Sequence, residues 1–225
     1  MNELKSSNSA YLKHHAQNPI HWKTWSEKTL DTALLENKLI VLSIGYSACH
    51  WCHVMEKETF SNQQIASFMN QNFISIKVDR EEHPEVDNAY MDFIMETKGN
   101  GGWPLNCILM PDTTPLYAGT YFQTKQWMQL INRFNVLHKS HPETLLDFTQ
   151  KYSQHLEEST GTNKKADFNF SNEFIEWRDF LDIKNGGIYS NQKFPLPTVL
   201  NYSMLAGKSK DWDLFINLTL DKISQ

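Results

Sequence analysis

Two cysteines separated by two residues, Cys49 and Cys52, form the most informative chemical pattern in this chain. They follow residues 39–44, of which five are apolar and none is charged. Such a run is typical of a strand buried on both faces, as in the centre of a parallel sheet. The residues after the cysteines, 54–58, have helical character. The pattern therefore predicts a strand, then a cysteine pair at the start of a helix.

This position predicts a reactive first cysteine. The unpaired N–H groups and the dipole at a helix N-terminus favour thiolate over thiol. Cysteines placed in this way have pKa values of roughly 3.5–7.5, against about 8.5 for a free cysteine. We interpret Cys49 as the attacking sulfur and Cys52, one turn further on, as the resolving sulfur that closes a disulfide. This chemistry needs no cofactor besides the Cys49–Cys52 disulfide.

Three alternatives compete for the same residues. The pattern from Cys49 to His53 also fits c-type haem attachment, which requires export, and residues 1–10 have no apolar signal-peptide core. His50 and His53 next to the thiols suggest zinc, but structural zinc sites take four ligands, usually from two separated pairs. We therefore expect no metal. The third alternative is a pair of inert thiols without activity.

The composition bounds the function classes. The chain has 225 residues, 40% of them hydrophobic, which suffices for one domain with a sizeable core and a smaller appendage. The formal net charge is −5 and no basic stripe is visible, so nucleic-acid binding is disfavoured. No apolar run approaches the ~20 residues that span a bilayer. Three cysteines without a signal peptide predict a reducing, cytoplasmic location.

The expected elements follow from local patterns. Large apolar side chains in residues 1–23 should wrap onto the domain, and the histidines among them should pack rather than bind metal. Capping boxes predict three helix starts, at Thr24–Glu27, Ser61–Gln64 and Ser140–Glu143.

A second strand is expected at residues 73–78, parallel to the first and joined to it by a right-handed crossover. Asp79 follows it, at the sheet edge where the first strand delivers Cys49. Ligand crevices of open α/β sheets lie at this edge, so Asp79 is a candidate neighbour of the thiols. A solvated turn or a helix cap is the alternative role for Asp79.

Residues 103–122 read as a β-hairpin opened by Trp103 and Pro104. A proline at the start of a strand cannot donate to the ladder. We predict a cis Trp103–Pro104 bond that brings backbone beside the cysteine pair. Cys107, three residues further on, is predicted to be a small core residue. Residues 1–160 should form the first domain, 161–168 a polar linker, and 169–225 a helical segment.

The predicted order of elements is that of the thioredoxin fold: an α/β domain with a central mixed sheet flanked by helices, here followed by a short all-helical extension. The chain resembles one branch of that fold, the DUF255 or spermatogenesis-associated protein 20-like family. Six stretches carry the resemblance, residues 9–12, 15–19, 43–55, 77–82, 101–106 and 118–122.

Members of this family generally continue into an α/α-toroid domain similar to sugar epimerases and glycosidases. Residues 186–188 and 193–195 look like the opening of that domain. The resemblance implies that residues 169–225 are its start, in a truncated form or an expressed fragment.

One position departs from working thioredoxins, which keep a buried carboxylate six residues before the first cysteine. Ser43 stands there in this chain. Without an internal base Cys52 should deprotonate slowly. His50, His53 or Asp79 are the candidates to substitute.

The residues between the thiols also differ from the Gly-Pro of reductases. His50, if protonated, would stabilise the Cys49 thiolate and so the reduced form. Stabilising the reduced form raises the reduction potential, which favours an oxidant or isomerase over a strong reductase.

The main hypothesis is a thiol–disulfide oxidoreductase domain that acts on protein thiols and disulfides. Trp103 and Pro104 would present backbone to the substrate, and Trp51 would add apolar contact. The alternative is a non-catalytic module for partner binding or redox sensing, attached to the toroid domain. Apolar residues of the last segment predict packing onto the first domain or self-association; they are Phe168, Phe170, Phe174, Trp177, Phe180, Trp212 and Phe215.

Overall fold

The computed structural model describes residues 1–160, 180–190, 193, 196–206 and 210–224. The chain divides into two compact units, Met1–Gly161 and Thr162–Gln225, each described by itself. The predicted linker 161–168 lies outside the described residues. The sequence pattern also predicts a helix at residues 172–181, nearly all of which lies outside them too. Among the described residues, no helix is both long and apolar enough to cross a membrane.

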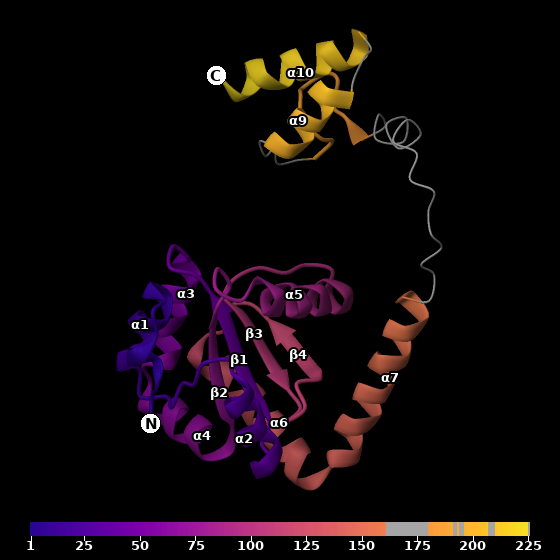
Figure 1. The fold of residues 1–225 in the computed structure, drawn as a ribbon. Helices are drawn as coiled ribbons and strands as arrows, with labels where there is room; N and C mark the ends of the chain where they lie inside the picture. Colours follow the sequence, from indigo (N-terminus) through magenta and orange to yellow (C-terminus); the bar gives the residue numbers. More distant parts are fainter. Residues whose placement is uncertain (161–179, 191–192, 194–195, 207–209, 225) are drawn as a thin grey trace. The chain divides into compact units, whose positions relative to one another are not determined.

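The first unit is built on a mixed four-stranded sheet of order β2-β1-β3-β4 (Figure 1). Its strands are β1 (Ile40–Gly45), β2 (Ile74–Asp79), β3 (Leu105–Leu109) and β4 (Pro115–Gly119). β1 is central, parallel to β2 and antiparallel to β3, and β3 and β4 form the expected hairpin. This is the thioredoxin-like α/β architecture predicted from the sequence.

Helices cover both faces of this sheet. They are α1 (Ala10–His14), α2 (Glu27–Glu36), α3 (His50–Met55), α4 (Gln63–Asn72), α5 (Pro84–Lys98), α6 (Thr124–Ser140) and α7 (Pro142–Thr160), with a π-helical turn, η3 (Glu56–Phe60), after α3. One core cluster joins the sheet to α1, α3, α4 and α6, and a second joins it to α2 and α5.

β1 shows why its sequence is almost continuously apolar. All six of its residues are buried. Val41 points into the first cluster, whereas Ile40, Leu42 and Ile44 point into the second. A strand with helices on both faces needs apolar side chains on each, which is the pattern that predicted it.

The three predicted capping boxes are wrong. α2 is capped by Ser26 rather than Thr24, and α4 by Asn62 rather than Ser61. Ser140 is the last residue of α6 and does not cap α7. A cap requires an extended backbone whose side chain reaches the N–H groups of the first turn. Neighbouring Ser, Thr and Asn residues all have suitable side chains, so the path of the chain into the helix selects among them.

The N-terminal segment wraps onto the first unit as expected. Its large apolar side chains are buried: Leu4, Tyr11, Leu12, Ile20 and Trp22. His15 is also buried, with Nδ1 2.8 Å from Oδ1 of Asn18. Burial lowers the pKa of His15, so this histidine packs as a neutral side chain.

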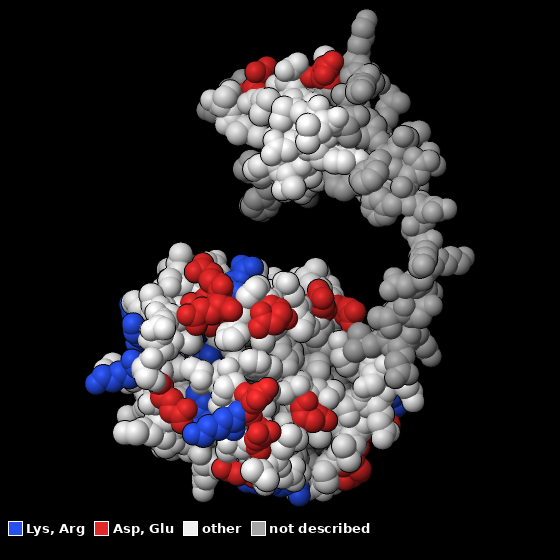
Figure 2. All heavy atoms as spheres, in the orientation of Figure 1, with Lys and Arg blue, Asp and Glu red and all other residues white. Residues whose placement is uncertain are grey.

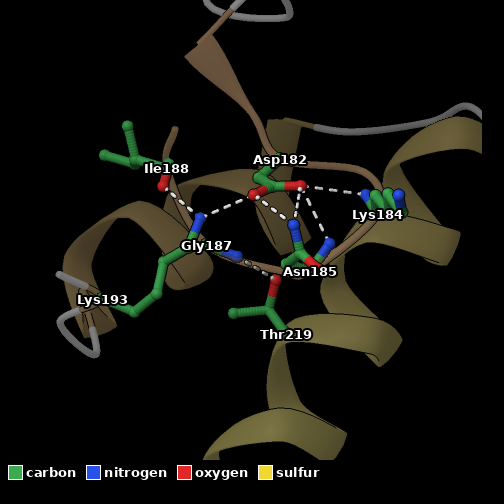
Figure 3. A network of polar contacts seen from close by, with 7 residues as sticks. All are labelled: Asp182, Lys184, Asn185, Gly187, Ile188, Lys193 and Thr219. Carbon is green, nitrogen blue, oxygen red and sulfur yellow. Dashed lines mark hydrogen bonds and ion pairs between the residues drawn. The ribbon is translucent and has the colours of Figure 1, made fainter. Parts of the chain in front are cut away.

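The second unit contains α9 (Pro197–Ala206) and α10 (Lys210–Ile223), with a small core of Leu181, Leu200, Phe215 and Ile216. Figure 3 shows the loop before them. The Asp182 carboxylate accepts hydrogen bonds from the backbone N–H groups of Lys184 (3.1 Å) and Asn185 (2.8 Å). It also forms an ion pair with Lys193 (2.7 Å). The Lys193 contact, followed by the backbone N–H bonds, holds the pKa of Asp182 well below its usual range.

Replacing Asp182 with alanine is expected to loosen this loop. The amides of Lys184 and Asn185 lose their acceptor, so both should exchange hydrogen faster. Hydrogen–deuterium exchange of peptides covering residues 182–190 measures the effect. Asp221→Ala, which removes an exposed carboxylate from the same unit, is the control. Equal exchange in Asp182→Ala and the native chain would contradict the proposed anchoring.

Candidate active site

The cysteine pair forms a disulfide at the start of α3. Cys49 is the N-cap residue of the helix, and its sulfur accepts the N–H of Cys52 at 3.2 Å. The two sulfurs are bonded and the Cα atoms lie 5.3 Å apart. The strand, the turn and the helix thus place both cysteines where the sequence pattern puts them.

Both cysteines belong to the first core cluster. Cys49 is 4% exposed and Cys52 1% exposed. Trp51, between them in the sequence, is 53% exposed. Its ring lies 5.1 Å from the ring of Tyr121 and 5.6 Å from that of His50. The disulfide is therefore largely covered, and the surface beside it is aromatic.

His53 is held by the loop that precedes the cysteines. Its Nε2 lies 2.8 Å from the carbonyl oxygen of Ser47, and its Nδ1 lies 3.9 Å from a carboxylate oxygen of Glu56. The ring also lies 5.6 Å from that of His14. His50 is exposed on the first turn of α3. In the described part of the chain, no hydrogen bond joins either ring to a sulfur.

Asp79 ends β2 and pairs in register with Gly45 at the end of β1. The carboxylate is almost fully buried and accepts the Ser9 hydroxyl at 2.6 Å and the backbone N–H of Glu81 at 3.0 Å. Ser9 in turn caps α1. Asp79 thus lies beside the end of the strand that leads to the cysteines, and it fastens the N-terminal segment to the sheet.

The Trp103–Pro104 peptide bond is cis. The next residue, Leu105, pairs with Ile44, so this bond lies beside the end of β1 that leads to the cysteines. The ring of Trp103 lies 5.9 Å from that of Tyr46, in the loop between β1 and Cys49. The hairpin therefore meets the cysteine loop through aromatic contact.

An ion pair between the partly exposed Arg80 and the buried Asp87 orients Trp103. Its indole N–H donates to Asp87 at 2.7 Å, and Arg80 pairs with the same carboxylate at 2.9 Å. The Arg80 guanidinium also lies 3.8 Å from the centre of the Trp103 ring. The sequence places Arg80 in a charge cluster after β2, but it gives no sign of Asp87 as partner, because the pairing depends on how α5 packs.

Lys77 is a buried basic residue whose position the sequence does not predict. It lies in β2, is 1% exposed, and donates to the Ser43 hydroxyl at 3.0 Å. Three aromatic rings surround its ammonium group, with centres at 4.5–5.4 Å: Phe60, Trp22 and Tyr11. A basic side chain thus lies against Ser43, the position where working thioredoxins keep a carboxylate.

Burial lowers the pKa of Lys77 to about 7, and the charge of Glu56 acts in the opposite direction. The amine therefore changes charge near neutral pH. A lysine that follows Ile74, Ser75 and Ile76 and precedes Val78, with no other charge among them, was the available signal. Lysine is rarely buried without a partner, so this pattern alone does not predict a buried amine.

The third cysteine, Cys107, lies away from the disulfide, in the other core cluster. Cys107 is a free, fully buried thiol in the second core cluster, as predicted. Burial raises its pKa well above the ordinary value, so it stays protonated. Among the described residues, no group of three or more His, Cys, Asp or Glu side chains could hold a metal ion.

A family model described as "Protein of unknown function, DUF255" matches residues 1–159. The chain belongs to the DUF255 family. It is 40% identical to spermatogenesis-associated protein 20 of Rattus norvegicus over 215 residues, which is 89% of this chain and 27% of that protein. It is 38% identical to the protein of that name in Homo sapiens over 214 residues, 89% of this chain and 27% of that protein.

An uncharacterized protein of Caenorhabditis elegans is 35% identical to this DUF255 chain over 238 residues, 99% of the chain and 33% of that protein. The chain thus spans a third or less of the length of these relatives. Among solved structures, a thioredoxin from Thermus thermophilus matches with 13% identity and a TM-score of 0.43, over 53% of this chain and 89% of that one. A DsbH oxidoreductase matches with 15% identity and a TM-score of 0.40, over 51% and 83%.

Proposed function

We propose that the Met1–Gly161 unit is a thiol–disulfide oxidoreductase that acts on protein thiols and disulfides through Cys49 and Cys52. The observation that carries the proposal is a disulfide at the first turn of a helix, at the end of the central strand. Membership of DUF255 and the thioredoxin-like architecture support it. The disulfide itself is the redox group, and the proposal needs no other cofactor.

The proposed reaction proceeds by two exchanges. In the reduced domain, the Cys49 thiolate attacks one sulfur of a substrate disulfide and releases the other as a thiolate. Cys52, after losing its proton, attacks Cys49 in the mixed disulfide, which frees the second substrate sulfur and closes the Cys49–Cys52 bond. The substrate gains two electrons and two protons, and the reverse sequence oxidises a substrate dithiol.

The neighbouring residues have supporting roles in this proposal. His50 and His53 would set the acidity of the thiols, and Asp79 would hold the N-terminal segment against them. Trp51, which is 53% exposed, would contact apolar side chains of the substrate. Trp103 and Pro104 would present their backbone to it, because the hairpin lies beside the end of β1. We therefore expect an extended, partly apolar peptide around the substrate cysteine.

The Cys52→Ala variant tests the proposal by trapping. Cys49 can still attack a substrate disulfide, but no second thiol resolves the product, so mixed disulfides should accumulate. A disulfide-bonded peptide with an aromatic residue next to cysteine serves as probe, and adducts that a reductant releases are counted by mass spectrometry. The Cys49→Ala, Cys52→Ala double variant is the control. Adduct yields equal in the two variants would refute attack by Cys49.

The low exposure of Cys49, 4%, favours a second candidate, a non-catalytic module whose disulfide serves structure or redox sensing. Alkylation of the reduced domain distinguishes the two. A catalytic Cys49 should react with iodoacetamide faster than a free cysteine peptide at pH 7, because more of it is thiolate. A rate far below that of the peptide supports the non-catalytic module.

The charge of the chain and its exposed side chains indicate which classes of partner it binds. On the face drawn in Figure 2, basic side chains of the first unit are interspersed with acidic ones and form no continuous stripe. Together with the net charge of −5, this supports protein rather than nucleic-acid partners. We also propose self-association through the second unit, where Leu205 is 83% and Leu214 65% exposed. Light scattering that gives the mass of one chain would refute it.

A further inference from the structure

Tyr11 has a hydroxyl group that the fold buries without a partner. The residue lies in α1 and is fully buried in the first core cluster. Its ring makes an edge contact with His15, with centroids 5.0 Å apart. Among the described residues, none forms a hydrogen bond with the Tyr11 hydroxyl. Buried hydroxyl groups are nearly always paired, so this one calls for an explanation.

The hydroxyl and the sulfur of Cys52 both lie beside Gly45. A Cβ atom built on Gly45 would come within 2.6 Å of that sulfur and closer still to the Tyr11 hydroxyl oxygen. Both atoms therefore border the same small volume at the end of β1. Any side chain at residue 45 would displace one of them, so Gly45 makes this approach possible.

Tyr11 remains a hydrogen-bond donor at ordinary pH. Burial, followed by the negative charges of Asp79 and Glu56, raises the pKa of its hydroxyl far above the usual value. The ammonium group of Lys77 faces its ring, with the nitrogen 5.4 Å from the centroid. A disulfide sulfur is a weak acceptor, whereas a thiolate accepts strongly.

We propose that the Tyr11 hydroxyl donates a hydrogen bond to the Cys52 sulfur when the Cys49–Cys52 bond is open. This inference rests on the proposed function and names a further residue for it. When a substrate thiolate attacks Cys49, the sulfur–sulfur bond breaks and its electron pair leaves on Cys52. Tyr11 stabilises that leaving thiolate. The donor is unpaired in the disulfide state and paired in the reduced state, so it makes the domain a stronger oxidant.

The Tyr11→Phe variant removes the hydroxyl and keeps the ring. In a glutathione redox buffer, we expect its thiol–disulfide equilibrium to move about tenfold toward the disulfide, which is about 30 mV for a two-electron couple. In a Cys49→Ser background, the same change should raise the pKa of Cys52 by about one unit, followed by thiolate absorbance. The stability of the oxidised protein should not fall, because the hydroxyl has no partner there.

Tyr90→Phe is the matched control. Tyr90 is also buried, lies in the second core cluster, and donates to the carbonyl of Thr113 at 3.0 Å. Its loss should destabilise both redox states equally and leave the equilibrium with glutathione unchanged. An unchanged equilibrium in Tyr11→Phe, or an equal loss of stability in its two redox states, overturns the inference.

The Tyr11→Phe measurements can fail independently of the test of the proposed function. They are equilibrium properties of the two cysteines and require no protein substrate. If trapping by Cys52→Ala fails while Tyr11→Phe shifts the equilibrium, the inference stands and the catalytic role falls. If trapping succeeds and the equilibrium does not shift, the function stands without Tyr11.

Discussion

The Cys49→Ser variant is expected to lose disulfide exchange by a factor of about a thousand or more. A serine hydroxyl keeps the shape and the N-cap acceptor of Cys49, so α3 should still form. Serine has no thiolate, so it cannot attack a substrate disulfide or form a mixed disulfide. The measurement is the rate at which the pre-reduced protein reduces a disulfide-bonded peptide, followed by chromatography.

Two further variants make this test specific. Cys107→Ala removes the remaining cysteine, which is fully buried in the second core cluster and does not take part in the proposed reaction. It should retain the native rate. Cys52→Ser should complete the first exchange and stop at the mixed disulfide. If Cys49→Ser keeps more than about a tenth of the native rate, Cys49 is not the nucleophile that the reaction requires.

The second large effect concerns stability. Lys77→Met is expected to make the protein more stable at pH 6 by on the order of 2–4 kcal/mol. Methionine fills similar volume among the aromatic rings without a buried charge. Part of the gain is offset because the hydroxyl of Ser43 loses its donor.

The lowered pKa of Lys77 also makes the stability of the folded protein depend on pH. The pKa of Lys77 is about 7 in the folded chain against an ordinary value of 10.5. Below pH 7 the amine is charged in both states, and folding carries the full cost of burying it. Above pH 7 only the unfolded chain still holds the proton, so stability rises with pH, by at most about 1.4 kcal/mol per unit. Lys77→Met should lack this rise.

Urea denaturation at pH 6, 7, 8 and 9 measures both effects. The quantity of interest is the difference between the native protein and Lys77→Met, because other groups titrate in both. One of these is Cys107, whose raised pKa lowers the stability of both proteins at alkaline pH. Lys28→Met, at an exposed site on α2, is the control and should change little. Parallel pH profiles for native and Lys77→Met proteins would contradict a lowered pKa.

Much of the first unit could be predicted from local patterns. The apolar run before Cys49 predicted β1, and residues 73–78 predicted β2 with the correct parallel pairing. Residues 103–122 predicted the hairpin. These patterns succeed because a strand between two helical layers must be apolar on both faces. The helix caps at Ser26 and Asn62 were missed by one or two residues, because several adjacent side chains can cap.

Local sequence patterns predicted some residues of the candidate active site and not others. Cys49 and Cys52 were identifiable because their spacing along the chain already places them one helical turn apart. The Trp103–Pro104 pair predicted that Trp103 lies beside the cysteines, but nothing in the sequence predicted its contacts with Arg80 and Asp87. These contacts come from separate elements and depend on how α5 packs. Asp79 was expected near the cysteines, yet its bond to Ser9 was not visible from its sequence context.

The sequence by itself determined the strand, the cysteine pair, the hairpin and the family, because each depends on residues close together in the chain. Only the tertiary structure decided that Lys77 lies against Ser43 among three aromatic rings, and that the Tyr11 hydroxyl and the Cys52 sulfur both border Gly45. The physical reason is that burial and electrostatics depend on distances between separate segments of the chain, which local patterns do not encode.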